Sequence, residues 1–359
     1  MTAALVALGA NLGDRRAMLD RAVQLLAERP HVRLIAASRP LVTRPIGGDA
    51  DQPEFLNAAA LFETALGPAE FLAAMAEIEL ALGRRRDEPR WSARPIDLDL
   101  LLFGSLVLDA PGLSVPHPRM GFRRFVIEPA AEIAPDMRHP TILWTLAELR
   151  DHLRFAPPYV AIAGAPRAGK SALAADVSVS LGARLLADPT TRQTAAGAAA
   201  GPSADALASG PAWQREIELL GLRFNQLAMS GLASPSGGAG HAPNAAIGDY
   251  WFDQSLCVAA IAVPAEQAAE FRERWRAAAV QAPRPKLLVL LDAPLDWLWE
   301  QIEPTAEVRS WLNRESFAQL RQSIVDRATM QYRGPLLRLD SRQPEHARAE
   351  LAAAVQAAN

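Results

Sequence analysis

Hydrophobic and polar residues in the first hundred positions follow two different periods. Short apolar runs, typical of strands, alternate with segments in which apolar residues recur every three or four positions, as on one side of a helix. The expected strands are Ala3–Leu8, His31–Ser38, Phe55–Phe62 and the run after Ile96, and the expected helices are Arg15–Glu28 and Pro68–Leu82. This βαββαβ order predicts an α+β ferredoxin-like sandwich, in which helices cover one face of an antiparallel sheet.

A second pattern begins after the consecutive prolines at positions 157 and 158. Apolar runs without alternation follow, which is typical of parallel strands that are buried on both faces. The candidates are Tyr159–Ala163, Arg184–Asp188, Ala246–Phe252 and Lys286–Asp292, with helical segments elsewhere in this half. We therefore expect a first domain at residues 1–152, a linker at 153–158 and, at 159–359, an α/β domain built on a parallel sheet.

The amino-acid composition mainly excludes certain classes of protein. The chain of 359 residues is 50% hydrophobic and 21% charged, with a formal net charge of −3. This slightly negative charge is not that of a basic protein that binds nucleic acids or membrane surfaces, so neither is expected as a partner. The single cysteine, Cys257, excludes an internal disulfide. Because the N-terminus also lacks a signal-peptide pattern, a cytoplasmic location is expected.

Asp97 and Asp99 lie two positions apart in an otherwise apolar run, so on a strand both carboxylates project from the same face. Two like charges this close need a cation, and Mg²⁺ carrying nucleotide phosphates is expected. Basic residues that would stabilise phosphate charge flank the pair: Arg84, Arg86, Arg94, His117, Arg119, Arg123 and Arg124. Each feature alone also fits a solvated surface or chance, but their combination indicates phosphoryl-type transfer.

Residues 164–171 read Gly-Ala-Pro-Arg-Ala-Gly-Lys-Ser and fit the P-loop pattern G-x-x-x-x-G-K-[ST] between a predicted strand and a predicted helix. In such a loop, backbone N–H groups from Gly164 to Gly169 cradle nucleotide phosphates and Lys170 pairs with the outer ones, while the Ser171 hydroxyl reaches one Mg²⁺. An ordinary strand-to-helix turn is the alternative. The full match, in a chain whose only other lysine is Lys286, favours an α/β P-loop NTPase-type domain.

Six longer motifs occur in order in the first domain. They are Ala7-Leu-Gly-Ala-Asn-Leu-Gly-Asp, Gln52-Pro-Glu-Phe-Leu-Asn, Gly83-Arg-Arg-Arg, Arg94-Pro-Ile-Asp-Leu-Asp, Pro116-His-Pro and Arg123-Arg-Phe-Val. Through them, residues 1–152 resemble the 6-hydroxymethyl-7,8-dihydropterin pyrophosphokinases of folate biosynthesis. The resemblance implies transfer of pyrophosphate from ATP to the pterin hydroxymethyl group, with two Mg²⁺ bound by Asp97 and Asp99.

The same resemblance implies roles for individual residues. The expected contacts are Arg84 and Arg94 with the phosphates, Arg86, His117 and Arg123 with ATP, and Phe55, Asn57 and Phe125 with the pterin. Aromatic rings would cover the flat heterocycle, and the asparagine amide would offer a donor and an acceptor to its edge. The family has Trp-Gly-Pro-Arg before the aspartates, whereas this chain has Trp91-Ser-Ala-Arg94, so the loop is expected to close differently. Thr43 receives no role, because the loop that follows it is longer than the family spacing.

The second domain resembles the deoxynucleoside kinases through its P-loop, Trp213-Gln214, the helix at Leu220–Leu227 and Gly248-Asp-Tyr-Trp-Phe-Asp. The resemblance implies phosphorylation of a deoxynucleoside. Asp188 would be the general base, Gln214 would recognise the nucleobase and Asp249 would lie near the metal. The family's arginine-rich lid is absent, and Arg309 and Arg314 are the candidate substitutes.

Two alternatives to a bifunctional transferase stay open. The second domain is a catalytically impaired nucleotide-binding or regulatory module, or the whole chain is a nucleotide-binding scaffold without catalysis. The aspartate pair and its arginines argue against the scaffold. The expected small-molecule partners are ATP, hydroxymethyldihydropterin and a deoxynucleoside.

Overall fold

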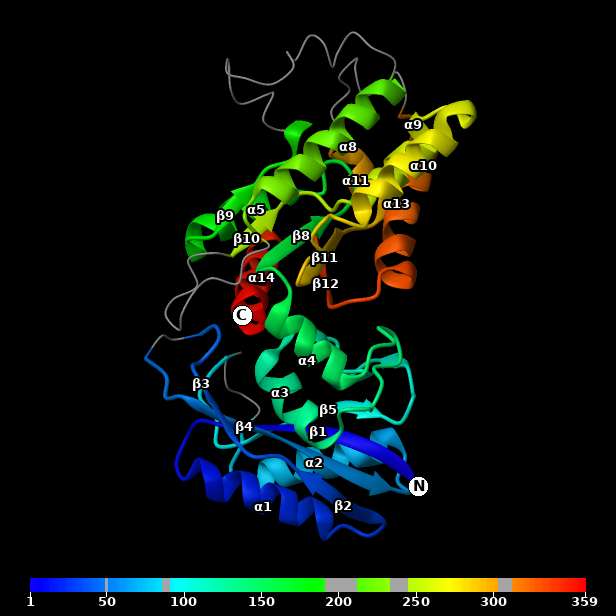
Figure 1. The fold of residues 1–359 in the computed structure, drawn as a ribbon. Helices are drawn as coiled ribbons and strands as arrows, with labels where there is room; N and C mark the ends of the chain where they lie inside the picture. The colour runs from blue at the N-terminus through cyan, green and yellow to red at the C-terminus, as the bar shows by residue number, and fades with distance from the viewer. Residues whose placement is uncertain (49–50, 86–90, 191–211, 233–244, 303–311) are drawn as a thin grey trace. The chain divides into compact units, whose positions relative to one another are not determined.

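The computed structural model describes residues 1–359 except 49–50, 86–90, 191–211, 233–244 and 303–311 (Figure 1). The chain divides into two compact units: Met1–Arg154 with Arg333–Pro335 and Ala353–Asn359, and Phe155–Tyr332 with Leu336–Ala352. The domain bounds expected at residues 152 and 159 stay predictions. The acidic pair and the P-loop pattern therefore belong to different units.

An antiparallel sheet forms the centre of the first unit (Figure 1). Its strands are β1 (Thr2–Ala10), β2 (Val32–Ala37), β3 (Leu41–Thr43), β4 (Phe55–Thr64) and β5 (Asp97–Phe103). They are arranged in the order β2-β4-β1-β5, and β3 pairs with the first residues of β4. The helices are α1 (Arg15–Ala27), α2 (Pro68–Ala81), α3 (Arg124–Ile133) and α4 (Leu146–Phe155), and β6 (Leu108–Ala110) pairs with β7 (Leu113–Val115). The expected βαββαβ succession is present, with β3 as an additional short strand.

Helices cover both faces of this sheet. One core joins the sheet to α1 and α2 and includes Val6, Leu8, Leu19, Phe71 and Leu98. A second core joins the opposite face to α3 and α4 and includes Leu5, Leu101, Val126, Ile127 and Leu149. The structure thus differs from the expectation of a single covered face. The physical reason is that β1 is apolar at almost every position, so both of its faces favour burial.

His139 lies between α3 and α4 and is 6% exposed. Burial lowers the pKa of His139 from 6.5 to about 4, so the folded protein keeps the ring neutral at pH 5 while the unfolded chain protonates it. The unfolded state then binds more protons, and the free energy of unfolding falls between pH 7 and pH 5 by about 2 kcal/mol for this group. We expect His139→Asn to remove this part of the pH dependence in denaturant unfolding. Substituting the exposed His346 should leave the dependence intact, and an unaltered slope in His139→Asn would contradict the prediction.

A parallel sheet forms the centre of the second unit, as the sequence predicts. Its strands are β8 (Tyr159–Ala163), β9 (Arg184–Leu186), β10 (Ala246–Gly248), β11 (Leu287–Asp292) and β12 (Leu336–Asp340), in the order β12-β11-β8-β10-β9. Because parallel strands end on the same edge, the loops after β8, β9 and β10 converge there.

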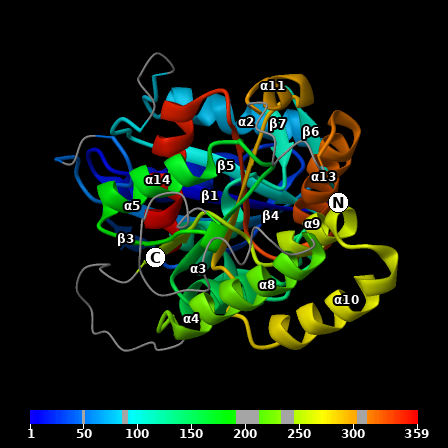
Figure 2. The ribbon, with the colours of Figure 1, turned by 90° about the horizontal axis from the view of Figure 1, so that it is seen from above.

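The helices of the second unit surround this sheet. Those in the described residues are α5 (Lys170–Leu181), α8 (Ala212–Met229), α9 (Gln254–Ala262), α10 (Ala265–Ala279), α11 (Leu295–Glu300), α13 (Arg314–Asp326) and α14 (Pro344–Ala358), of which the residues from Ala353 on belong to the first unit. α8 and α10 lie side by side in both views (Figures 1 and 2). Among the described residues, no helix combines the length and the apolar character that crossing a membrane requires.

Candidate functional site

Gly9 of β1 is the point at which the predicted pterin residues and the predicted metal ligands meet. It pairs with Asn57 of β4 on one side and with Asp97 of β5 on the other. A Cβ atom at position 9 would lie 3.3 Å from Asn57 Oδ1, 3.9 Å from Phe55 Cδ1 and 4.0 Å from Asp97 Cβ. Phe55, Asn57 and Asp97, which are far apart in the sequence, therefore lie around the position that a side chain of residue 9 would occupy.

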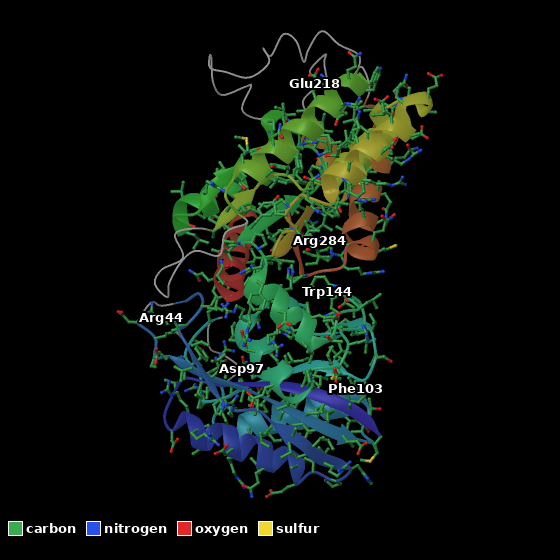
Figure 3. The ribbon with its side chains drawn as sticks, viewed as in Figure 1. Arg44, Asp97, Phe103, Trp144, Glu218 and Arg284 are labelled. Carbon is green, nitrogen blue, oxygen red and sulfur yellow. The ribbon has the colours of Figure 1, made fainter. Side chains whose placement is uncertain are left out.

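Asp97 and Asp99 project from the same face of β5, as the alternation predicts, while Leu98 packs into the core on the other face. Asp97 lies at the start of the strand (Figure 3). Burial, and next the charge of Asp99, raise the pKa of Asp97. A bound cation would relieve both effects, because it favours the ionised carboxylate.

The aspartate pair fits a magnesium ion that arrives with its nucleotide. No cluster of three or more potential ligands among His, Cys, Asp and Glu is found in the described ranges. Mg²⁺ commonly binds through one or two carboxylates, with phosphates and water completing its coordination. The two carboxylates thus supply what the protein contributes to such a site.

Four of the predicted basic residues surround the pair. Arg84 Nη1 lies 2.6 Å from Asp97 Oδ1, and Arg94 Nη1 lies 3.0 Å from Asp97 Oδ2. His117 Nε2 and Arg123 Nη1 each lie 3.8 Å from Asp99 Oδ2. These four side chains therefore converge on the two carboxylates.

Two of the basic residues that flank the pair in the sequence, His117 and Arg124, do not bring a positive charge to it. Burial, followed by the charges of Arg123 and Arg119, lowers the pKa of His117 to about 3, so its ring is neutral at physiological pH. Arg124 instead contacts Glu128 on its own helix, with Nη2 and Oε1 3.4 Å apart. Arg86 lies outside the described residues. The positive charge at the pair thus comes from arginines, and His117 contributes a neutral ring.

The side chains expected around the pterin have defined partners. Asn57, 6% exposed, donates a hydrogen bond from Nδ2 to Thr43 Oγ1 at 2.8 Å. Thr43 is paired with Phe55 in the β3–β4 ladder. Although the sequence analysis assigned Thr43 no role, its hydroxyl holds the Asn57 amide. The guanidinium carbon of Arg123 lies 5.6 Å from the centroid of the Phe125 ring, which connects this aromatic side chain to the arginine group.

Three loops at this end of the sheet are tied together by residues to which the sequence assigned no role. Asn11 Oδ1 accepts a hydrogen bond from the Arg94 backbone at 2.7 Å, and Asn11 Nδ2 donates to the Pro53 carbonyl at 3.3 Å. Gln52 Nε2 donates to the Trp91 carbonyl at 2.7 Å. Asn11 and Gln52 stood inside recognised motifs, but only the structure reveals their long-range partners. The Ser92-Ala93 segment is thus held by contacts on both sides.

Gly48 allows two of these loops to approach each other. Its φ is +70°, and a Cβ atom there would lie 2.5 Å from the Trp91 carbonyl oxygen and 2.6 Å from Gln52 Nε2. We expect Gly48→Ala to separate the loops and to reduce roughly tenfold the pyrophosphate transfer that the family resemblance implies, because small displacements of positioned groups are costly. Gly112 has a φ of +80° with nothing within 4 Å, so Gly112→Ala controls for backbone strain alone. Equal rates of AMP formation in the two variants would contradict the prediction.

The predicted P-loop lies between β8 and α5, as the motif requires. A Cβ atom at Gly164 would lie 2.3 Å from the Leu291 carbonyl oxygen, and Gly169 has a φ of +89°. Lys170 Nζ donates to the carbonyls of Gly164 and Ala165, both at 3.0 Å, and burial lowers its pKa to about 8. The lysine thus folds back over its own loop.

Ser171 and Gln254 are two further polar residues next to this loop. Ser171 is exposed in the first turn of α5. Gln254 of α9 exchanges two hydrogen bonds with the backbone of Gly164, each 3.1 Å long. The sequence analysis assigned Gln254 no role. Its contact with the P-loop backbone is seen only in the structure.

Acidic residues and a partly buried arginine gather beside Lys170. Arg223 Nη2 lies 2.8 Å from Asp188 Oδ2, and its Nη1 donates to Ser255 Oγ at 3.1 Å. Asp249 Oδ1 accepts a hydrogen bond from the Asp188 backbone at 2.5 Å. The charges of Asp188, Asp249 and Arg223 all act on the pKa of Lys170, which brings these four groups into one cluster.

Other residues predicted for the second unit lie outside this cluster. Gln214 is exposed near the start of α8. Arg314 forms a surface ion pair with Asp296, and Arg309 lies outside the described residues. The arginine that the structure brings to the cluster is Arg223, which lay inside a quoted motif without a role.

Comparison with known proteins concerns mainly the first unit. A family model described as 7,8-dihydro-6-hydroxymethylpterin-pyrophosphokinase matches residues 5–135. The 2-amino-4-hydroxy-6-hydroxymethyldihydropteridine pyrophosphokinase of Pseudomonas aeruginosa is 46% identical over 135 residues, which are 38% of this chain and 82% of the relative. The Bacillus subtilis protein of the same name is 45% identical over 130 residues, 36% of this chain and 77% of that protein.

A solved structure of deoxyadenosine kinase from M. mycoides with bound dATP covers 54% of this chain and 95% of its own. Its TM-score is 0.41 and its sequence identity is 13%, a likeness too distant to support a conclusion about activity. The two pyrophosphokinases are much more similar to this chain in sequence, and the matched residues cover most of the length of each. The chain therefore belongs, through its first unit, to the 7,8-dihydro-6-hydroxymethylpterin-pyrophosphokinase family and is a transferase.

Proposed function

We propose that the first unit transfers pyrophosphate from ATP to the hydroxymethyl group of 6-hydroxymethyl-7,8-dihydropterin, a step of folate biosynthesis. The observation that carries this proposal is the row Asn57, Gly9 and Asp97 on three adjacent strands. It places an amide suited to a heterocycle edge next to a carboxylate suited to a metal–phosphate complex. The family membership supports the same reaction.

The paired carboxylates would hold magnesium, two ions by the family resemblance. The chemistry that bound Mg²⁺ would supply there is neutralisation of phosphate charge and orientation of the triphosphate toward the pterin hydroxyl. Arg84, Arg94 and Arg123 present guanidinium groups toward Asp97 and Asp99, where they would stabilise negative charge on the transferring oxygens. The neutral His117 would contribute a ring nitrogen to ATP binding, and Arg86 is a further candidate.

The pterin would bind by shape and edge recognition. Phe55 and Phe125 would contact its faces, and Asn57 would hydrogen-bond its amide edge. The hydrogen bond that Thr43 Oγ1 accepts fixes the orientation of the Asn57 amide and leaves Oδ1 directed toward Gly9. This orientation would present an acceptor to ring N–H groups.

The test is the dependence of AMP formation on all reactants. Purified full-length protein with ATP, Mg²⁺ and hydroxymethyldihydropterin is expected to form AMP and the pterin pyrophosphate. Leaving out the pterin or the magnesium should stop the reaction. Pterin-independent hydrolysis of ATP to ADP as the sole activity would refute the proposal.

For the second unit, a nucleoside kinase is favoured over a binding module by one observation, the partly buried Arg223 beside Asp188 in the P-loop cluster. Gly164 and Gly169 would frame the phosphate-binding backbone, Lys170 would bind the outer phosphates and Ser171 would ligate one Mg²⁺. Asp188 would accept the proton of the nucleoside hydroxyl. Arg223, which lies beside Asp188, would stabilise charge in place of the missing lid arginines.

Phosphorylation assays decide between the two candidates for the second unit. Each deoxynucleoside is offered separately with γ-labelled ATP, and formation of a labelled monophosphate is measured by chromatography. Label on at least one deoxynucleoside supports the kinase. In that case Gln214→Ala tests whether this exposed side chain affects nucleobase preference. Binding of ATP without any labelled product would instead support the regulatory or impaired module.

A further inference from the structure

Glu79, near the end of α2, connects two parts of the candidate transfer site. Its Oε1 accepts a hydrogen bond from the backbone N–H of Leu98 at 2.7 Å. Leu98 lies between Asp97 and Asp99, so this bond ties the helix to the strand segment that presents both carboxylates. The same oxygen contacts Arg84 Nη1, and the Glu79 side chain is 14% exposed.

Arg84 is shared between two acids. Its Nη1 contacts Glu79 and lies 2.6 Å from Asp97 Oδ1, which makes a continuous chain from α2 to the carboxylate pair. If Asp97 binds magnesium, its oxygen is no longer fully available to the guanidinium. Glu79 is then the acid already in contact with Arg84 that keeps this cation at the site.

We propose that Glu79 is a positioning residue for pyrophosphoryl transfer, which holds Arg84 beside the phosphates while Asp97 is engaged with the metal. The proposal rests on the proposed function of the first unit. Its physical basis is that an arginine between two carboxylates remains localised when one of them changes partner. Groups that orient a functional side chain in this way typically affect activity by roughly tenfold or more.

A neighbouring ion pair on the same helix shows what a purely structural contact looks like. Glu77 pairs with Arg29, with Oε2 and Nη2 2.7 Å apart, and its side chain is 63% exposed. Exposed pairs of this kind contribute little to stability and have no direct route to the acidic pair. Glu77→Gln therefore serves as the matched control, because it removes the same charge from the same helix.

The experiment is a double-mutant cycle between Glu79→Gln and Arg84→Ala. Glutamine keeps an acceptor oxygen for the Leu98 N–H but removes the charge that holds Arg84. We expect Glu79→Gln to reduce kcat roughly tenfold or more, with KM for the pterin and the melting temperature little changed. In the Arg84→Ala background the same substitution should change kcat less than about twofold, because the residue on which it acts is gone. Glu77→Gln should match the wild type.

Equal losses in the two backgrounds would overturn the proposal, since Glu79 would then act independently of Arg84. No loss from Glu79→Gln would overturn it as well. If this variant does not fold, Glu79→Asp, which keeps the charge but shortens its reach, replaces it in the cycle.

A second measurement does not depend on catalysis. The Nε–H signal of Arg84 in ¹H–¹⁵N NMR spectra, assigned by its absence in Arg84→Ala, is expected to shift and broaden in Glu79→Gln and to stay unchanged in Glu77→Gln. An unchanged signal in Glu79→Gln would overturn the proposal even with full activity data in hand. If the wild type forms no AMP, the proposed function fails, and this spectrum still decides whether Glu79 holds Arg84.

Discussion

Asp97→Asn is expected to abolish pterin-dependent AMP formation, with a loss on the order of 10³-fold. Asparagine keeps the size of the side chain but removes the charge that would bind magnesium and that pairs with Arg84 and Arg94. The variant should fold, because burial and Asp99 already disfavour the ionised form of Asp97 and raise its pKa. AMP formation is measured by chromatography at saturating ATP and Mg²⁺, alongside circular dichroism.

The control for this prediction is Asp20→Asn. Asp20 is 62% exposed and pairs with Arg16 on the surface of α1, so its substitution removes an equal charge from an ion pair that does not involve Asp97 or Asp99. It should retain wild-type activity. AMP formation by Asp97→Asn at more than a tenth of the wild-type rate would be inconsistent with a metal-binding role for this carboxylate.

Lys170→Met is expected to disrupt the nucleoside phosphorylation proposed for the second unit while leaving pterin-dependent AMP formation unchanged. Lys170 Nζ now binds two carbonyls of its own loop, and these contacts would be exchanged for nucleotide phosphates. Loss of the lysine should reduce this proposed activity on the order of 10²-fold or more, since phosphoryl transfer depends on charge stabilisation.

Arg348→Met is the matched control for the lysine. Arg348 pairs with Asp176 and is 44% exposed, so its substitution also removes one positive charge from the second unit. Product formation from labelled ATP and a deoxynucleoside is compared in both variants. Phosphorylation that survives Lys170→Met at the wild-type level would assign the activity to another site.

The local pattern around Asp97 and Asp99 was sufficient to predict their common face. Alternation over a few residues determines orientation on a strand, and Leu98 occupies the opposite face, as this rule requires. The strand–loop–helix context of Lys170 was predictable for the same reason, because the motif and its flanking elements are contiguous in the sequence. Both predictions depend on short-range information.

Contacts between distant segments were not predictable in this way. Glu79 lies on a helix whose sequence pattern indicates only an amphipathic surface, and its bond to Leu98 depends on how α2 packs against the sheet. Arg223 reaches Asp188 from α8, across a separation that no local spacing rule covers. The second covered face of the first sheet likewise depends on α3 and α4, which follow the strands in the chain.

The structure also shows how the loop is held where Ser92 and Ala93 replace the family's Gly-Pro. The family's Gly-Pro turn is missing, but the flanking residues are anchored: Gln52 bonds to the Trp91 carbonyl and Asn11 bonds to the Arg94 backbone. The ends of the segment are thus fixed without the turn residues. Arg94 can therefore contact Asp97 despite the changed sequence between Trp91 and itself.

Pyrophosphoryl transfer by the first unit is tested most directly by following the β-phosphorus atom of ATP. The protein is incubated with Mg²⁺, hydroxymethyldihydropterin and ATP labelled with ³²P at the β-phosphate, without any nucleoside. We predict that the β-label appears on the pterin in an amount equal to the AMP formed. Recovery of the β-label in ADP, with none on the pterin, would contradict it.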